Sequence, residues 1–587
     1  MRMKLSLVAI LVIVAAGVLS ACGQAATPPP APAPTSAPAA PTEAPAPPAP
    51  TEAPAPAAPA ATEAPPTAEP QPTTAPAAER SGGILRMGIR AADIASLDPH
   101  FATTTQDRAL VDMVFNGLIR YKPGDSSVFE PDLATSLPEP EMVDGKQVWT
   151  FALRQGVMCH PTADVPSYEL TSEDVVYSLN KAATTDTSAY AGEYTGMSFE
   201  TVDPYTVKIT LEQPLSKVLF YPKVANYSGG FIVCKQAAEK LGPDGLKTHP
   251  VGTGPFMFKS YDAQEKVELV ANDAYFRGKP QLDGVDFRYI ADLNSVELGL
   301  RGGELDVING APDQIWVEKM QGVPDVKVDV FGPGEVAVLH FNTNIPPLDK
   351  LEVRQAIAYA LDRDEFLALV GESVGGKVYS PVPAQFLPGG LTQEEVAAQG
   401  LEYKTDLEKA RKLLADAGFP DGFSLQMVTS EMTGYKVLYE SMQAQLAKIG
   451  IKIDLQVVDH STMHSTIRND SNPLVIYIAW RPNADIFLTR FFHSDSIVVT
   501  GAKPDTNFSH YDKIDALIEQ ARAESDPEKQ VALWKEAQIK ILEDMVAYPI
   551  QYQSQVYARS TNVDFGHELK SVLALYPGVD ETTHFLK

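Results

Sequence analysis

Residues 435–457 read YKVLYESMQAQLAKIGIKIDLQV. Tyr435–Lys448 predicts a helix, Gly450 ends it, and Ile451–Val457 predicts a β-strand. Further strands are predicted at Tyr205–Leu211, around Val267 and Leu269, over Asp286–Tyr289 and over Val475–Trp480. Alternating helices and strands favour an α/β fold.

Helix signals are clear at three other places. Apolar residues from Val353 to Leu361 recur at helical spacing. Thr405 with Glu408 matches a capping box, which predicts a helix ending at Gly418. Asp526–Pro527 predicts the start of another helix, because an N-capping residue stands directly before proline.

The N-terminus has the layout of a secretory signal. A basic start precedes an apolar stretch from Leu5 to Leu19, which is shorter than the about 20 residues of a membrane span. Leu19–Cys22 resembles the bacterial lipobox, in which the cysteine thiol takes a diacylglyceryl group and becomes the new N-terminus. We expect residues 1–21 to be a lipoprotein signal peptide and Cys22 to be the lipid anchor. An ordinary signal peptide with a chance cysteine is the alternative.

Residues 22–81 predict a tether. After Cys22 they are almost all Pro, Ala and Thr, and they contain no aromatic residue. Such a segment cannot bury enough surface to offset its ordering entropy, so we expect a disordered linker. Its prolines favour extended chain of about 3.1 Å per residue, or roughly 180 Å in full. A low-complexity insertion without this role is the alternative.

The remaining length is enough for two or three domains, and 44% hydrophobic residues are typical of a globular protein. No later apolar run is long enough to cross a membrane. The net charge of −27 argues against binding to nucleic acid or to anionic lipid surfaces, whose phosphates would repel the chain.

Cys159 and Cys234 are the cysteines that remain after Cys22. In an oxidising exterior they can form a disulfide, but the sequence leaves this bridge open. Two distant cysteines do not make a metal site. His160 follows Cys159, but neighbours on a strand point to opposite faces, so we do not expect a thiol–imidazole pair.

The signatures of catalysis are weak. Gly371–Gly375 matches the nucleophile-elbow pattern around Ser373, but that motif needs a strand before the serine and a helix after it. Here a helix is predicted before it, so a loop is expected. No glycine-rich loop ends in Lys-Ser or Lys-Thr, so we expect no ATP site. His460 and His464, four residues apart, could hold a metal, yet no third ligand is evident and a solvated helix face is the alternative.

An aromatic and polar segment runs from Tyr477 to Asp485 and continues at Phe491–Ser494. Its aromatic rings provide flat walls, and its Asn, Asp and Arg side chains provide directional contacts, a mixture that suits a ligand pocket. An aromatic core cluster with a polar cap explains the composition equally well.

Several phrases occur in a characteristic order: Gly82–Leu85, Ser96–His100, Val114–Leu118, Pro131–Ala134, Trp149–Gly156, Leu170–Val175, Gly252–Phe256, Gly303–Asp306 and Val353–Ile357. In this order and spacing the chain resembles the bacterial extracellular solute-binding proteins of the oligopeptide, dipeptide and nickel class (family 5), which serve ABC importers. The likeness covers nearly everything from Ser81 onward.

The resemblance implies an α/β, periplasmic-binding-protein-like type II clamshell with an extra domain on its first lobe. By the family pattern, the first lobe covers 82–125, 215–335 and 560–587. The extra domain covers 126–214, and the second lobe covers 336–559. A ligand would bind between lobes that close over it.

The resemblance also implies binding residues. Residues after the Leu-Asp-Pro-His phrase pair with peptide backbone in relatives, by strand addition; here they are Ala102, Thr103 and Thr104. The Asp that holds a peptide's amine in relatives is replaced by Asn483, which lacks the charge that attracts an ammonium, and Asp485 is the nearest substitute. Further candidates are Trp480 and Tyr552 as walls, Arg481 for a carboxylate, and Tyr190 and Tyr194 in the extra domain.

We therefore expect a lipid-anchored, extracytoplasmic receptor that captures a small solute and delivers it to a membrane permease, without a cofactor. It would be a monomer and no enzyme, with ATP hydrolysis left to other subunits. A peptide is the first candidate ligand; a sugar, an opine-like compound or a metal complex is the alternative. A secreted serine hydrolase using Ser373 is the alternative from another class.

Overall fold

The computed structural model describes residues 82–572 and 576–586. The predicted signal peptide, Cys22 and the linker therefore lie outside the described residues, which all belong to one compact unit. Among these residues, no helix combines the length and the apolar character needed to span a membrane.

A nine-stranded sheet runs through the described residues in the order β10-β11-β12-β1-β13-β19-β14-β18, and β15 pairs with β19. Its strands are β1 (Ile84–Ile89), β10 (Phe256–Asp262), β11 (Lys266–Ala271), β12 (Gly284–Tyr289), β13 (Val307–Asn309), β14 (Val326–Phe341), β15 (Gly375–Lys377), β18 (Leu474–Ala479) and β19 (Ala547–Ser560). β1 is parallel to β12 and β13, whereas the other neighbours in this sheet are antiparallel.

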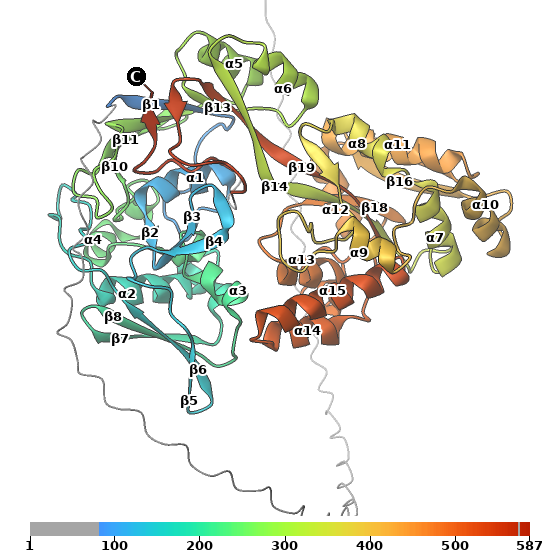
Figure 1. The fold of residues 1–587 in the computed structure, drawn as a ribbon, viewed down its shortest axis with the longest axis horizontal. Coiled ribbons are helices and arrows are strands. Elements are labelled where there is room, and N and C mark those ends of the chain that lie inside the picture. Colours follow the sequence, from blue (N-terminus) through green and yellow to red (C-terminus); the bar gives the residue numbers. More distant parts are fainter. Residues whose placement is uncertain (1–81, 573–575, 587) are drawn as a thin grey trace, which may run out of the picture. The chain divides into compact units, whose positions relative to one another are not determined.

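The two long strands, β14 and β19, join the two ends of this sheet. β13 pairs with the last residues of β19, around Arg559, whereas β18 pairs with the last residues of β14, from Val336 to Phe341. In Figure 1 these strands run side by side from the blue and green part of the chain toward its yellow and orange part. They form a double connection between two packed regions.

Smaller sheets complete the strand inventory. A four-stranded sheet has the order β5-β6-β8-β7, from β5 (Glu141–Val143), β6 (Lys146–Ala152), β7 (Met197–Asp203) and β8 (Thr206–Leu211). The paired strands are β2 (Asn116–Gly117) with β9 (Phe231–Ile232), β3 (Ile119–Lys122) with β4 (Asp125–Pro131), β16 (Ser424–Ser430) with β17 (Lys452–Val458), and β20 (Val563–Asp564) with β21 (His584–Phe585).

Helices pack around these sheets. They are α1 (Thr105–Val114), α2 (Ser172–Ala182), α3 (Lys217–Phe220), α4 (Lys235–Leu246), α5 (Leu293–Arg301), α6 (Gln314–Gln321), α7 (Leu351–Ala360), α8 (Arg363–Val370), α9 (Gln393–Ala398), α10 (Leu407–Asp416), α11 (Thr433–Ala447), α12 (His460–Arg468), α13 (Ala484–Phe492), α14 (Asp515–Ala523) and α15 (Pro527–Glu543). The mixed architecture confirms the predicted α/β class.

Three large hydrophobic clusters form the interior. The β1 cluster gathers residues of β1, α1, β11 and β12, such as Leu85 and Phe287. The β6 cluster lies on the four-stranded sheet and includes Trp149. The α11 cluster contains Tyr439 and Trp534 and extends over β18, α13 and α15. Burial of these apolar faces is the main stabilising force, at roughly 25 cal/mol per Å² of apolar surface.

Residues 435–457 fold as predicted: α11 is followed by β17, which pairs in parallel with β16. Asp526 caps α15, its carboxylate accepting from the N–H groups of Glu528 and Lys529. The predicted capping box at Thr405 is wrong. Asp406 caps α10 instead, because the Thr405 hydroxyl donates to the carbonyl of Leu361 at 2.9 Å.

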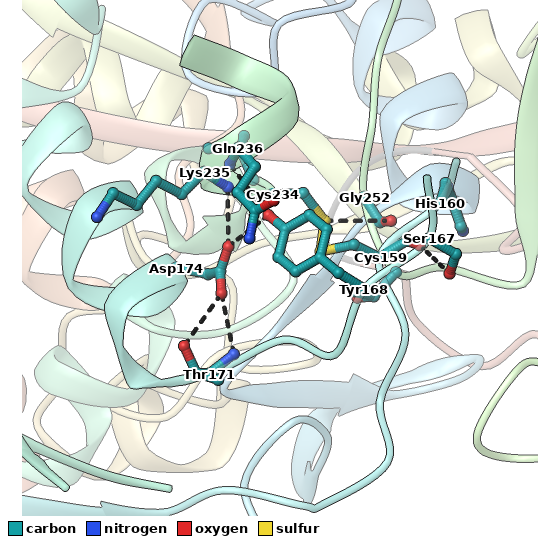
Figure 2. Close-up of a disulfide and its surroundings, with 12 residues drawn as sticks. Cys159, His160, Ser167, Tyr168, Thr171, Asp174, Cys234, Lys235, Gln236 and Gly252 are labelled. Atoms are coloured by element: carbon teal, nitrogen blue, oxygen red, sulfur yellow. Dashed lines mark hydrogen bonds between the residues drawn. A yellow bond between two sulfur atoms is a disulfide. The ribbon is translucent and has the colours of Figure 1, made fainter. Parts of the chain in front are cut away.

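The structure joins Cys159 and Cys234 by a disulfide (Figure 2), which links the segment after β6 to the start of α4. Both cysteines are buried. The Tyr168 hydroxyl donates to Asp174 at 2.7 Å, and the same carboxylate accepts from the backbone N–H of Lys235 at 2.9 Å (Figure 2). With its thiol in the bridge, Cys159 forms no pair with His160, whose Nε2 lies 2.9 Å from the carbonyl of Gly254.

Candidate ligand-binding site

The candidate site forms where β18 ends. In the sheet, Val336 of β14 lies between Ala479 of β18 and Tyr552 of β19. Trp480 follows Ala479 directly, so sheet register places it and Tyr552 in the same region. The Tyr552 ring lies edge-on to Phe386, with centroids 4.8 Å apart, and it covers Gly376, where an added Cβ would come within 2.6 Å of the ring.

An aromatic column connects distant parts of the chain at this point. The Trp480 ring lies edge-on to Tyr227, with centroids 6.2 Å apart. On Tyr227 lies the guanidinium of Arg108, a residue of α1, with its Cζ 5.2 Å from the ring centre. The column therefore joins the β1 side of the molecule to the end of β18.

Three donors in and beside this column have no hydrogen-bond partner among the described residues. They are the indole N–H of Trp480 and the Nε atoms of Arg481 and Arg108, and all three are buried. Leaving a buried donor unpaired costs about 1–3 kcal/mol. Native proteins rarely tolerate such groups without water, an ion or a ligand to meet them.

Arg481 is held in place by other contacts. One of its terminal nitrogens donates to the carbonyl of Trp480 at 2.9 Å, and its Cζ lies 5.3 Å above the Phe491 ring. Desolvation, with the nearby Arg490, lowers the pKa of Arg481 from its usual value. A group of this kind gains from an anion that replaces its lost hydration.

Glu335 is the carboxylate nearest in sequence to Val336. Its side chain is exposed, and no ion pair or hydrogen bond of it occurs within the described ranges. The surrounding walls nevertheless raise its pKa by desolvation, and Arg481 partly offsets that increase.

Asn483 and Asp485 are already engaged in local contacts. Asn483 caps α13, and its Oδ1 accepts from the N–H of Ile486 at 2.9 Å. Asp485 is buried and forms an ion pair with Arg522 of α14 at 3.3 Å. Burial raises the pKa of Asp485, and Arg522 opposes the increase. Neither residue offers an unpaired carboxylate to an ammonium group.

The predicted backbone-pairing segment is largely occupied. The N–H of Ala102 donates to the carbonyl of Asp98 at 3.0 Å, and its carbonyl accepts from the Tyr190 hydroxyl at 2.6 Å. The hydroxyl of Thr104 caps α1 by accepting from the N–H of Asp107. Within the described part of the chain, only Thr103 of the three has both backbone groups without a partner.

Tyr194 takes a structural place. Its ring is buried in the β6 cluster, and its hydroxyl donates to the carbonyl of Lys223 at 2.8 Å. The sequence missed Arg108, Tyr227, Lys223 and Arg522, which carry no local motif. They become candidates only because the fold brings their segments to the end of β18.

A cavity of about 480 Å³ lies beside the aromatic column. One wall comes from residues 192–227 and the other from residues 482–522, and both Tyr227 and Asn483 line it. Its size falls within the range of pockets for small ligands. The sequence-predicted Trp480, Arg481, Asn483 and Asp485 are thus close together, next to a real cavity.

The structure supports neither the catalytic motif around Ser373 nor the metal site at His460 and His464 that the sequence left open. Ser373 lies in the loop between α8 and β15, so a strand does not precede it and a helix does not follow it. His460 and His464 place their Nε2 atoms 3.1 Å apart, but Arg468 donates to Nδ1 of His464 at 3.0 Å. Arginine only donates, so Nδ1 of His464 accepts and its proton lies on Nε2, which leaves neither ring nitrogen of His464 free for a metal.

Within residues 82–572 and 576–586, no group of three or more His, Cys, Asp or Glu side chains is arranged to hold a metal ion. The predicted pair of histidines is therefore a hydrogen-bonded chain. Ser430 completes it at the other end, with its hydroxyl 3.1 Å from Nδ1 of His460.

Comparison with known proteins identifies the family of this chain. The family model of bacterial extracellular solute-binding proteins, family 5 (middle), matches residues 128–498. The chain belongs to that family. Its members are binding proteins of ABC importers, and we assign this chain the same role, as an extracytoplasmic receptor for a small solute that works with permease subunits.

Solved structures of relatives show the type II periplasmic-binding-protein fold. The structure of MoaA from A. tumefacien R10, in complex with mannopinic acid, is 38% identical, has a TM-score of 0.69, and covers 86% of this chain and 100% of its own. DppA from Helicobacter pylori, in complex with peptide STSA, is 26% identical with a TM-score of 0.67, covering 87% of this chain and 99% of its own.

A curated relative is the heme-binding protein A of Haemophilus influenzae. It is 28% identical over 462 residues, which are 74% of this chain and 81% of the relative. These relatives thus have names that refer to different solutes. Membership of the family does not select among them, so the ligand has to be argued from the site.

Proposed function

We propose that the chain captures a small organic acid of the opine type and delivers it to its permease. The observation that carries this proposal is the set of buried, unpartnered donors on Trp480, Arg481 and Arg108. Two of these side chains are cationic, and an arginine meets a carboxylate with short, charge-assisted hydrogen bonds. MoaA, which is 38% identical, is described with mannopinic acid.

The carboxylates at the site support the same ligand class. Asp485 is paired with Arg522, and the residue at the loop position after Trp480 is the amide Asn483. Glu335, the free carboxylate nearby, would suit an internal amine of the solute. A receptor built this way favours acids over solutes that need a dedicated carboxylate for a primary ammonium.

A peptide is the second candidate. DppA from Helicobacter pylori is described with peptide STSA, and the free backbone groups of Thr103 could pair with an extended main chain. Pairing at Thr103 alone would give less binding free energy than the continuous strand addition expected from the sequence. Ala102 and Thr104 already form hydrogen bonds within the chain.

The remaining features extend this proposal. Cys22 would carry the lipid that holds the receptor at the outer face of the cell membrane, and residues 22–81 would act as its tether. The body would be a monomer without catalytic activity. Its first lobe would comprise 82–125, 215–335 and 560–587, with 126–214 as the extra domain and 336–559 as the second lobe. Labelling with radioactive palmitate should be lost in Cys22→Ser.

Calorimetry on the purified chain tests the ligand class. Mannopinic acid should bind with micromolar affinity or better, about −8 kcal/mol, and a matched set of di- and tripeptides should bind more weakly. Native mass spectrometry of protein purified without refolding should show a co-purified acid. Tight binding of varied peptides without binding of the acid would replace the first candidate with the second.

A further inference from the structure

The cavity of about 480 Å³ contains a cation without a partner. Lys223 lies at the end of the short 3-10 helix Tyr221–Lys223 and lines the cavity. Within residues 82–572 and 576–586 its ammonium forms no hydrogen bond and no ion pair. Burial lowers the pKa of Lys223, against the attraction of Glu193 and Asp485 and with the repulsion of Arg522. The position therefore costs free energy unless an anion meets the ammonium.

A second free donor lies across the cavity. The Oδ1 atom of Asn483 is fixed by its role as the cap of α13, which leaves its NH₂ group as the end available to the cavity. No hydrogen bond of that group occurs among the described residues. An ammonium on one wall and an amide donor on the other match the two oxygens of a carboxylate.

The charges that line the cavity are compatible with one added negative charge. Among the buried or half-buried residues, Arg522 and Asp485 neutralise each other, which leaves Lys223 as the uncompensated charge. Glu193 and Glu212 also line the cavity, but their side chains are exposed at its rim, where water screens them.

The wall that carries Lys223 is held against the opposite wall by contacts that need no ligand. Ser216, just before α3, donates from its hydroxyl to Oε1 of Gln530 in α15 at 2.7 Å, and this pair is buried. Leu219 of α3 is packed in the α11 cluster. These contacts hold the two walls together without a ligand, so little ordering of the backbone would be needed on binding.

We propose that this cavity is a subsite for a carboxylate of the solute, bound between the ammonium of Lys223 and the amide nitrogen of Asn483. This inference rests on the proposed function, and it names the group of the solute that the cavity recognises. Since the two residues come from segments far apart in the sequence, the carboxylate would bridge these segments.

Two variants test the subsite by calorimetry with mannopinic acid. Lys223→Met removes the charge but keeps the apolar stem, and we expect its Kd to rise at least about tenfold, as a lost charged hydrogen bond would give. Lys223→Arg should recover most of the affinity. Lys217→Met is the matched control, because Lys217 lies on the adjacent α3, pairs with Glu139 and does not line the cavity; its Kd should not change.

Asn483→Asp is the sharper variant, because aspartate caps a helix as well as asparagine does and α13 should stay intact. It places a negative charge where the carboxylate would bind, so the Kd for mannopinic acid should rise more than in Lys223→Met. Binding of carboxamide derivatives of mannopinic acid, in which the acid groups are neutralised, should be nearly unaffected by either substitution.

The outcomes separate the two proposals. If the wild-type chain binds mannopinic acid and both variants bind it with unchanged Kd, the subsite is overturned and the proposed function stands. The same holds if the variants lose the carboxamides as strongly as the acid, because Lys223 and Asn483 would then act on the structure only. If the wild-type chain binds no organic acid, the proposed function and the subsite both fail.

Discussion

Two polar groups, one on α12 and one just after β18, differ in how completely their donors and acceptors are hydrogen-bonded. On α12, His460 and His464 form a continuous chain from Ser430 to Arg468, in which each imidazole nitrogen has a partner. After β18, Trp480 and Arg481 keep buried donors without a partner. Both groups contain aromatic and cationic side chains, so composition does not distinguish them.

The difference separates structural from binding roles. A closed chain of hydrogen bonds has already gained its free energy on folding, and an added ligand would have to break it. A buried donor without a partner has lost its hydration and has gained nothing in return, so a ligand that meets it recovers that loss. We therefore expect substitutions in satisfied networks to change stability, and substitutions of the unpartnered donors beside the aromatic column to change affinity.

The largest effect should come from removing the disulfide, because it is a covalent link between two distant parts of the chain. Cys159 and Cys234 are separated by 75 positions, and opening a loop of that length costs about 4 kcal/mol of unfolding free energy. Replacing both by alanine should lower the midpoint of urea unfolding strongly and leave the Kd for the solute within about twofold. A loss of affinity at conditions where the variant remains folded would break the division proposed above.

Arg481→Met should have the next largest effect, on affinity. Removing a charged group that meets a carboxylate should raise the Kd about tenfold to hundredfold, which is about 1.4–2.7 kcal/mol. Arg490→Met is the control, since Arg490 is exposed and pairs with Asp505 at 3.5 Å. Calorimetry should detect the difference; equal Kd values for the two variants would remove Arg481 from the site.

Trp480→Phe should raise the Kd by up to about tenfold, because it removes one neutral hydrogen bond and keeps an aromatic wall. Trp534 gives a demanding comparison, since its indole N–H is also buried without a partner but lies inside the α11 cluster. Trp534→Phe should change stability alone. If both substitutions weaken binding equally, an unpartnered donor is no guide to the ligand.

Local sequence patterns predicted more of the fold than of the candidate site. The helix and strand at residues 433–458 and the cap at Asp526 depend on neighbours in sequence, and they were correct. Thr405 failed because a tertiary contact to Leu361 took its hydroxyl. The aromatic and polar segment from Tyr477 to Asp485, together with the family resemblance, led to Trp480 and Arg481. Arg108, Tyr227 and Lys223 could not be found, because the residues they meet are distant in the sequence and only the tertiary fold brings them together.

Substitution of His464 in the histidine chain should have the smallest effect. That effect is on the unfolding free energy, and it should depend on pH. Desolvation, with smaller contributions from the neighbouring His460 and Arg468, lowers the pKa of His464 from 6.5 to about 4. Because the folded pKa lies below the unfolded one, the stability that His464 contributes is complete above about pH 6.5 and is lost as the pH falls toward 4.

Urea unfolding at pH 7 and pH 4.5 should therefore show a smaller drop in unfolding free energy for His464→Gln than for the wild-type chain. The side chain is partly exposed, so we expect the difference to stay within about 1 kcal/mol after screening by solvent. The solute Kd at pH 7 should be the same for both proteins, since His464 belongs to the satisfied network. A variant that keeps the wild-type pH slope but loses affinity would reverse the roles assigned to the two groups, because His460 and His464 would then face the solute.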